Sequence, residues 1–331
     1  MAADPTIRQV QGLLDARRVA EAARLLAAAA RAGQTEAMVE LAQWSIAGNI
    51  IPRDLPAARE LLGKAGAAGH EDAALLHAAF LASETGGEAD WPGALAALRA
   101  LAPGSQRARA QLEIIEEMDL GDLGFPARAF EPRQLSERPY VAVCEGFVSK
   151  GECDYLAAVG GPYLQPSVVI DPASGQHVPH PIRRSDGAVF GVHTEDLVVS
   201  AINRRIAAVS ATNYRQGEPL QLLHYRPGGE YRAHMDALPS EANQRIMTVI
   251  VYLNDGYRGG ETQFLRTGLS FRARAGDALI FRNVTADGRP DQMALHAGAP
   301  VTAGTKLIAT RWIRKEEFTF PPPRPFLATR P

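Results

Sequence analysis

Residues 221–236 read QLLHYRPGGEYRAHMD: an apolar run, a Pro-Gly-Gly turn and a second run that ends in His234 and Asp236. Short runs rich in leucine, β-branched and aromatic residues, separated by such turns, predict β-strands. On a strand, residues two apart point to the same face, so we expect His234 and Asp236 to share one face of a sheet. Both side chains can then reach one metal ion without an unusual backbone.

Further strands are predicted on both sides of this stretch. SVVI (167–170), RIMTVIVYLN (245–254), DALIF (277–281) and LIATRWI (307–313) are short and apolar, and turn signals such as RGG and AGD lie between them. Several short strands of this kind predict a sandwich or barrel, here a jelly roll (double-stranded β-helix) over residues 139–318. Flanking helices are expected at residues 150–160 and 195–210, where the apolar residues recur at helical spacing.

A metal site is predicted inside this jelly roll. His296 follows Asp236 by 60 residues, and only a folded sheet can bring the two together. Two histidines and one carboxylate form the set that binds non-heme Fe(II) and leaves coordination positions open. Lys306, ten residues further on, offers a cation for a second carboxylate such as the far end of 2-oxoglutarate. An isolated His-X-Asp is weak, but this combination predicts an iron oxygenase.

Five segments of the chain resemble the prolyl 4-hydroxylase branch of the Fe(II)/2-oxoglutarate dioxygenases. They are QLLHYRPGGEYRAHMD, RIMTVIVYLND, RGGETQF, AGDALIFRN and ALHAGAPVTAGTKLIATRWIR, and CEGFVSKGECDYL resembles the segment that opens that catalytic domain. The resemblance covers about residues 139–315. It is specific to the superfamily and less specific to prolyl substrates.

The resemblance implies a reaction and a role for each matching residue. It implies hydroxylation of a C–H bond coupled to oxidative decarboxylation of 2-oxoglutarate to succinate, with Fe(II), O2 and optionally ascorbate. The implied catalytic and metal-binding residues are His234, Asp236 and His296, and the implied 2-oxoglutarate-binding residues are Lys306, Tyr225 and Thr262. The implied substrate-binding residues are Tyr231, Arg245 and Trp312. Tyr231 and Trp312 would equally suit a core, and Arg245 a structural ion pair.

The N-terminal region has a different period. Residues 1–117 are rich in alanine and leucine at helical spacing, and a glycine and an alanine recur together at Gly33 and Ala37, Gly69 and Ala73, and Gly104 and Ala108. A period in the mid-thirties predicts a helical solenoid, and AGQTEAMVELA and AGHEDAALLHA resemble Sel1-like repeats, relatives of the tetratricopeptide repeat. The third unit is degenerate, and a small helical bundle is the alternative. A solenoid favours a partner protein as ligand.

The remaining segments and the composition set the broad class. Residues 118–138 are expected to form a linker, residues 319–331 a proline-rich tail, and the loop at 166–187 either a lid over the site or a plain surface loop. A net charge of -2 gives no footprint for nucleic acid, and no apolar run is long enough for a membrane span. Two cysteines suggest buried thiols, and with no secretory signal we expect a cytoplasmic protein.

Three functions remain open from the sequence. The first is a hydroxylase of a prolyl or other residue in a protein or peptide. The second keeps the chemistry but acts on a free amino acid or small metabolite. The third is a repeat-based adaptor or oxygen sensor with little turnover. The intact set His234, Asp236, His296 and Lys306 favours an enzyme.

Overall fold

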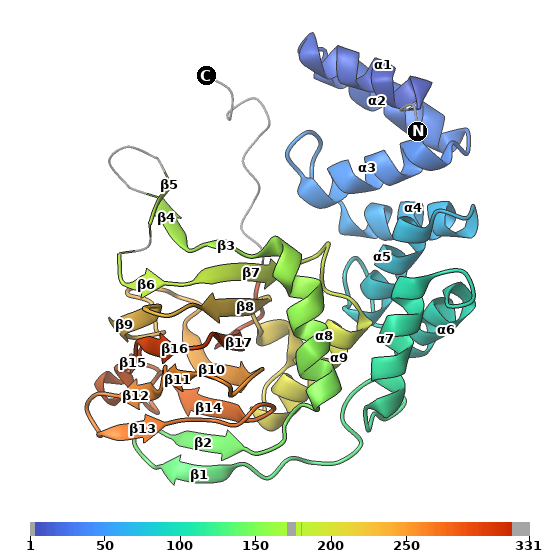
Figure 1. Ribbon diagram of the computed structural model, residues 1–331. Helices are drawn as coiled ribbons and strands as arrows, with labels where there is room; N and C mark the ends of the chain where they lie inside the picture. The colour runs from blue at the N-terminus through green and yellow to red at the C-terminus, as the bar shows by residue number, and fades with distance from the viewer. Residues whose placement is uncertain (1–3, 171–176, 180, 320–331) are drawn as a thin grey trace.

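The computed structural model describes residues 4–170, 177–179 and 181–319. A helical N-terminal region is followed by two facing antiparallel sheets, with two helices between the sheets and the N-terminal region (Figure 1). The predicted class, a helical solenoid followed by a jelly roll, is confirmed. Among the described residues, no helix combines the length and the apolar character that crossing a bilayer requires.

The N-terminal helices stack as pairs. Their bounds are α1 Pro5–Asp15, α2 Val19–Arg31, α3 Thr35–Ala47, α4 Leu55–Ala67, α5 Glu71–Ala82, α6 Trp91–Leu101 and α7 Gln106–Glu117. The repeated glycines Gly33 and Gly69 end α2 and α4 with φ of 85° and 93°, a left-handed backbone that suits glycine. The repeated alanines, Ala37, Ala73 and Ala108, are at most 1% exposed, because each lies where two helices approach closely.

The buried side chains of these helices belong to two different cores. One core is formed by α1 to α5 and includes Leu26, Trp44, Leu62 and Phe80. The second contains side chains of α5, α6 and α7, such as Trp91, together with those of the larger sheet and the two later helices. The helical region therefore shares a continuous core with the jelly roll.

The larger sheet has the strand order β1-β2-β14-β10-β17-β8-β7-β3. Its strands are β1 Arg133–Ser136, β2 Val141–Cys144, β3 Gln165–Pro166, β7 Asp186–Phe190, β8 Leu220–Tyr225, β10 Arg245–Tyr252, β14 Ala278–Arg282 and β17 Lys306–Arg314. The predicted helices are α8 Lys150–Gly160 and α9 Leu197–Val209, and they lie between this sheet and α5 to α7 (Figure 1). The other face of the sheet is left for the functional site.

The smaller sheet has the order β13-β12-β15-β9-β6. Its strands are β6 Arg183–Arg184, β9 Glu230–His234, β12 Thr262–Phe264, β13 Leu269–Phe271 and β15 His296–Gly298. A separate pair, β11 Arg258–Gly259 and β16 Val301–Ala303, lies beside it. A core that includes Tyr225, Tyr252, Phe264 and Phe281 fills the space between the two sheets.

Three predicted connecting segments can be compared with the structure. The expected linker, 118–138, contains β1, which pairs with β2, and a bridge between Leu120 and Pro126, so part of it belongs to the sheet. The expected lid loop, 166–187, contains β6 and a hairpin of β4 Val168–Ile170 and β5 His177–Pro179, while residues 171–176 and 180 lie outside the described residues. Of the tail, residues 320–331 also lie outside them. Cys144 and Cys153 are buried and unbridged.

Candidate active site

The two predicted histidine ligands face each other across a strand pair. His234 is the last residue of β9 and His296 the first of β15, and the antiparallel register sets the two opposite one another. Asp236 lies in a bend beyond the end of β9, so the expectation that it shares the strand with His234 was wrong. The bend still carries the carboxylate to the histidines: Oδ1 is 3.5 Å from His234 Nε2, and Oδ2 is 3.7 Å from His296 Nε2.

The hydrogen bonds around these three side chains orient their ligand atoms. Nδ1 of His234 is 2.8 Å from the Arg232 carbonyl oxygen, and Nδ1 of His296 is 2.9 Å from the Ala294 carbonyl oxygen. Each Nδ1 therefore donates to the backbone, which leaves each Nε2 lone pair facing Asp236. The hydroxyl of Thr248 donates to Asp236 Oδ2 over 2.6 Å.

The electrostatics of the group favour the protonation states that a metal requires. Burial acts to raise the pKa of Asp236, but the two imidazoles and the Thr248 hydroxyl outweigh it and hold that pKa well below its usual range. Burial lowers the pKa of His296 to about 4. An ionised Asp236 and a neutral His296 are the forms that bind a metal.

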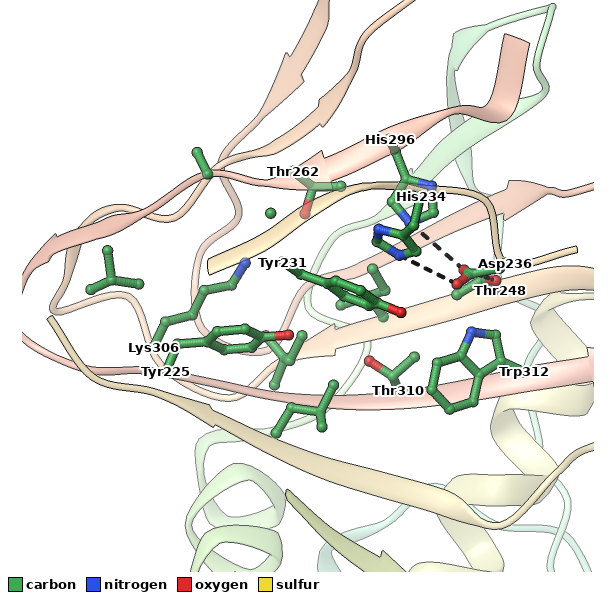
Figure 2. A pocket seen from close by; sticks show the side chains of 16 residues that line it. Tyr225, Tyr231, His234, Asp236, Thr248, Thr262, His296, Lys306, Thr310 and Trp312 are labelled. Carbon is green, nitrogen blue, oxygen red and sulfur yellow. Dashed lines mark hydrogen bonds and ion pairs between the residues drawn. The ribbon is translucent and has the colours of Figure 1, made fainter. Parts of the chain in front are cut away.

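The donor set fits iron. One ligand atom from each of the three residues lies within 4.8 Å of the other two, and no other such group of His, Cys, Asp or Glu occurs in the described part of the chain. Two imidazole nitrogens and one carboxylate, without a thiolate, match the facial set of non-heme Fe(II) sites. Figure 2 shows these three side chains at one end of a cavity and Lys306 at the other.

Lys306 occupies a site built for an anion. It begins β17 opposite Tyr225 of β8, is 3% exposed, and its Nζ donates to the Gly260 carbonyl over 2.7 Å. The rings of Tyr225, Tyr252 and Tyr257 surround Nζ at 5.7, 5.2 and 6.0 Å. Within the described ranges no carboxylate forms an ion pair with this ammonium, and burial lowers its pKa to about 8. A bound carboxylate would supply the missing counter-charge.

The other two predicted cosubstrate residues lie around the same end. Thr262 and Tyr225 both line the cavity with Lys306. The Thr262 hydroxyl shares a hydrogen bond of 2.8 Å with the hydroxyl of Tyr252, a residue that the sequence reasoning missed. A buried cation at one end of the cavity and three candidate metal ligands at the other suit a molecule that carries a second carboxylate.

Further lining residues were missed although strand alternation could have found them. On β17 the cavity is lined by Lys306, Ile308, Thr310 and Trp312, every second residue, and on β10 by Thr248 and Ile250. Counting in steps of two from Lys306 identifies the first set. The β10 set required knowing that β10 lies next to β17 in the sheet.

The three predicted substrate residues lie in unlike surroundings. Tyr231 stacks on His234 with ring centroids 3.4 Å apart, and Trp312 lines the same end of the cavity. Arg245 instead donates to Glu218 over 2.6 and 2.8 Å and lies 4.1 Å from the centre of the Trp312 ring. Glu218, which the sequence reasoning missed, also accepts from Arg314 over 2.6 Å. The guanidinium of Arg245 is thus already paired.

Several known proteins are similar to parts of this chain. A model of the 2OG-Fe(II) oxygenase superfamily matches residues 220–314. A viral collagen prolyl hydroxylase from Paramecium Bursaria Chlorella virus-1, solved with 2OG, is 27% identical with a TM-score of 0.43, covering 53% of this chain and 95% of that chain. A Sel1 repeat protein from Oxalobacter formigenes is 22% identical with a TM-score of 0.30, covering 33% of this chain and 85% of that one.

The family is shown by a plant relative. Prolyl 4-hydroxylase 1 of Arabidopsis thaliana is 34% identical over 206 residues, which cover 56% of this chain and 72% of the relative. The match extends over most of the relative's length and is not confined to a short motif. The chain therefore belongs to the prolyl 4-hydroxylase family of 2OG-Fe(II) oxygenases, dioxygenases that use Fe(II), 2-oxoglutarate and O2.

Proposed function

We propose that this dioxygenase hydroxylates a prolyl residue in a protein or peptide. The observation that carries the proposal is the end of the cavity beside the metal ligands. There the rings of Tyr231 and Trp312 line the cavity, with one face of each covered by His234 and by Arg245 respectively. Two buried polar atoms, Trp312 Nε1 and Thr310 Oγ1, have no hydrogen-bond partner within the described residues. An apolar ring next to a backbone carbonyl, as in a prolyl residue, would pack on the aromatic faces and accept from the free donors.

The residues of the site divide the remaining tasks. His234, Asp236 and His296 would hold the iron, and Lys306 with Tyr225 and Thr262 would hold the far carboxylate of 2-oxoglutarate. The bound iron, 2-oxoglutarate and O2 supply the oxidising power, with succinate and CO2 as coproducts of the hydroxylated substrate. Around them the buried tyrosines and the Ile308 side chain exclude water, which strengthens the attraction between Lys306 and a carboxylate.

We further propose that the helical region recruits the protein that carries this residue. A groove lies between the helices α3, α5 and α7 on one side and α8 with residues 193–196 on the other. Apolar side chains that line it include Leu75 and Leu76 of α5, and the Asp72–Arg107 ion pair lines it as well. The helices that line the groove and the smaller sheet lie on opposite faces of the larger sheet (Figure 1). The occupant of the groove would therefore be a segment of the substrate protein distant from the target residue.

The reaction is tested by succinate formation from 2-oxoglutarate under air with added Fe(II). Wild type is compared with His234→Ala, each with a proline-containing peptide, the same peptide with alanine for proline, and free proline. Iron-dependent succinate that is stimulated only by the proline peptide, with one oxygen atom added to that peptide, supports the proposal. Stronger stimulation by free proline would favour a small-metabolite hydroxylase, and no turnover by folded, metal-loaded protein would favour an adaptor or sensor.

The recruiting groove has its own test. Leu76→Arg places a charge among the apolar side chains that line the groove and should raise KM for a full-length protein substrate while leaving kcat/KM for a short proline peptide unchanged. Gln11→Arg, which makes the same change of charge on the exposed surface of α1, serves as the matched control. Equal KM values for the protein substrate in wild type and Leu76→Arg would refute recruitment through the groove.

A further inference from the structure

Each of the three metal-ligand side chains has a hydrogen-bonding group behind it, but the groups differ in kind. The two histidines are held by backbone carbonyls, of Arg232 and Ala294. Asp236 is held by a side chain, the hydroxyl of Thr248, 2.6 Å from Oδ2 (Figure 2). Asp236 is therefore the ligand whose support a point substitution can remove.

Thr248 is in turn held by Asn283. The Asn283 Nδ2 lies 2.9 Å from Thr248 Oγ1, and both side chains are 1% exposed. An amide nitrogen can only donate, so Thr248 Oγ1 accepts this bond and its single proton is left for Asp236. The opposite amide orientation would give the Thr248 proton two competing acceptors. The arrangement thus fixes one direction: Asn283 donates to Thr248, and Thr248 donates to Asp236.

The backbone makes this arrangement rigid. Thr248 lies in the middle of β10 and pairs with Phe281 of β14. Asn283 directly follows β14, where its N–H donates to the Ile246 carbonyl and its carbonyl accepts from the Asp291 N–H, both over 2.9 Å. Two central strands of the larger sheet therefore reach across to a bend at the end of the smaller sheet.

We propose that Asn283 and Thr248 are positioning residues that hold Asp236 as a one-oxygen metal ligand. Oδ1 lies 3.5 Å from His234 Nε2 and Oδ2 lies 3.7 Å from His296 Nε2. The Thr248 hydroxyl engages Oδ2 alone, so Oδ1 keeps both of its lone pairs for a metal. A carboxylate that turned to bind through both oxygens would take one of the open positions of a facial site, and 2-oxoglutarate and O2 need those positions. The inference rests on the metal site and is independent of which substrate is hydroxylated.

The test compares Thr248→Val, which keeps the shape but removes the hydroxyl, with Thr248→Ser, which keeps the hydroxyl. Anaerobic titration of the full-length protein with Co(II), followed by its visible absorption, gives the metal affinity without turnover. We expect Thr248→Val to bind Co(II) about 10- to 100-fold more weakly than wild type, and Thr248→Ser to restore most of the loss. On protein saturated with Co(II), Thr248→Val should also bind 2-oxoglutarate more weakly.

Asn283→Leu tests the second step and leaves Thr248 in place, so it also serves if Thr248→Val does not fold. It should weaken Co(II) binding less than Thr248→Val, and the double variant should be no weaker than Thr248→Val alone. Equal Co(II) affinity in wild type and folded Thr248→Val would overturn the proposal. So would additive losses in the double variant, or unchanged 2-oxoglutarate binding to metal-saturated Thr248→Val.

Discussion

The outer helices, α1 to α4, and the inner helices, α6 and α7, look alike in sequence but pack into different cores. Helices α1 to α4 pack among themselves and against part of α5, as repeats do in a solenoid. Helices α6 and α7 bury their apolar side chains in the same core as α8, α9 and the larger sheet. The third repeat unit is thus, by its packing, part of the oxygenase, and this explains why its sequence departs most from the repeat pattern.

A single buried cation marks the junction. Arg204 of α9 donates to the carbonyl of Ala82 at the end of α5, and its guanidinium lies 5.1 Å from the ring centres of both Trp91 and Tyr214. These contacts join the inner helices to the catalytic half through a group that is 2% exposed. A repeat boundary predicted from sequence periodicity is therefore not always the boundary of a unit that folds independently.

The largest effect is expected when the inner helices are deleted together with the outer ones. Deleting residues 1–117 should abolish the folded oxygenase, because it takes Trp91, Leu98 and Leu112 out of a core that continues under α8 and α9. Deleting residues 1–52, which removes α1 to α3, should leave a folded protein with metal-dependent 2-oxoglutarate turnover. Circular dichroism and succinate formation measure both. A stable, active protein from the larger deletion would show that the inner helices are dispensable.

Two tryptophans provide a matched pair for the same comparison. Trp91 and Trp44 are 3% and 4% exposed, the first in the core shared with the oxygenase and the second in the outer core. Each tryptophan-to-alanine change should cost about 3–5 kcal/mol of the core that it leaves. Trp91→Ala should lower the temperature of the unfolding transition in which metal binding is lost. Trp44→Ala should instead lower the temperature of a separate transition, the unfolding of the outer helices. One common transition that both variants shift equally would contradict the division.

Lys306→Met extends the comparison into the catalytic half. Burial holds the pKa of Lys306 at about 8, below its unfolded value, so the folded state binds this proton less tightly than the unfolded state. The charge therefore costs stability below pH 8, and the cost disappears as the pH rises from about 8 towards about 10.5. The metal-free variant should be roughly 3 kcal/mol more stable at pH 7, with no gain near pH 10.5.

The gain in stability should appear only in the unfolding transition of the oxygenase and its inner helices. The same substitution should abolish 2-oxoglutarate binding. Calorimetric melts at pH 7 and pH 10 separate the two effects. A variant that is less stable than wild type at pH 7 would show that the ammonium is a net stabilising group.

The smallest effect is expected in the outer helices at Gly66. A Cβ at this position would lie 2.8 Å from the Ala74 Cα, where α4 and α5 approach most closely. Gly66→Ala should cost about 1–3 kcal/mol through overpacking, and only in the outer transition. Gly12→Ala, in α1, is the control because nothing lies within 4 Å of its Cβ position. A loss of 2-oxoglutarate turnover in Gly66→Ala would show that the packing of the outer helices affects the active site.

The site residues that the sequence could predict are those whose spacing alone carries information. His234, Asp236, His296 and Lys306 form a pattern with few alternative explanations, and the structure gathers the first three around one point. The bend that carries Asp236 off its strand could not be predicted, because a two-residue spacing fits a strand or a turn equally well.

Partners that meet only through the fold were invisible in the sequence. Glu218 binds Arg245 across 27 residues and Asn283 binds Thr248 across 35, and no local pattern couples either pair. The two cores of the helical region were hidden for the same reason. Periodicity predicts that a helix has an apolar face and leaves open what covers it.

Strand β17 links the two ends of the cavity and thereby limits how this enzyme can change. Alternate positions of the strand face the cavity: Lys306, Ile308, Thr310 and Trp312. On the opposite face, Arg311 donates to the backbone carbonyls of Asn203 and Tyr214. At about 3.3 Å per residue the strand is a ruler of roughly 20 Å between its anion end and its aromatic end. Inserting or deleting one residue within the strand would move the side chains on one side of the change to the opposite face of the sheet. New specificities must therefore arise by exchanging side chains or surrounding loops, while the length of the strand stays constant.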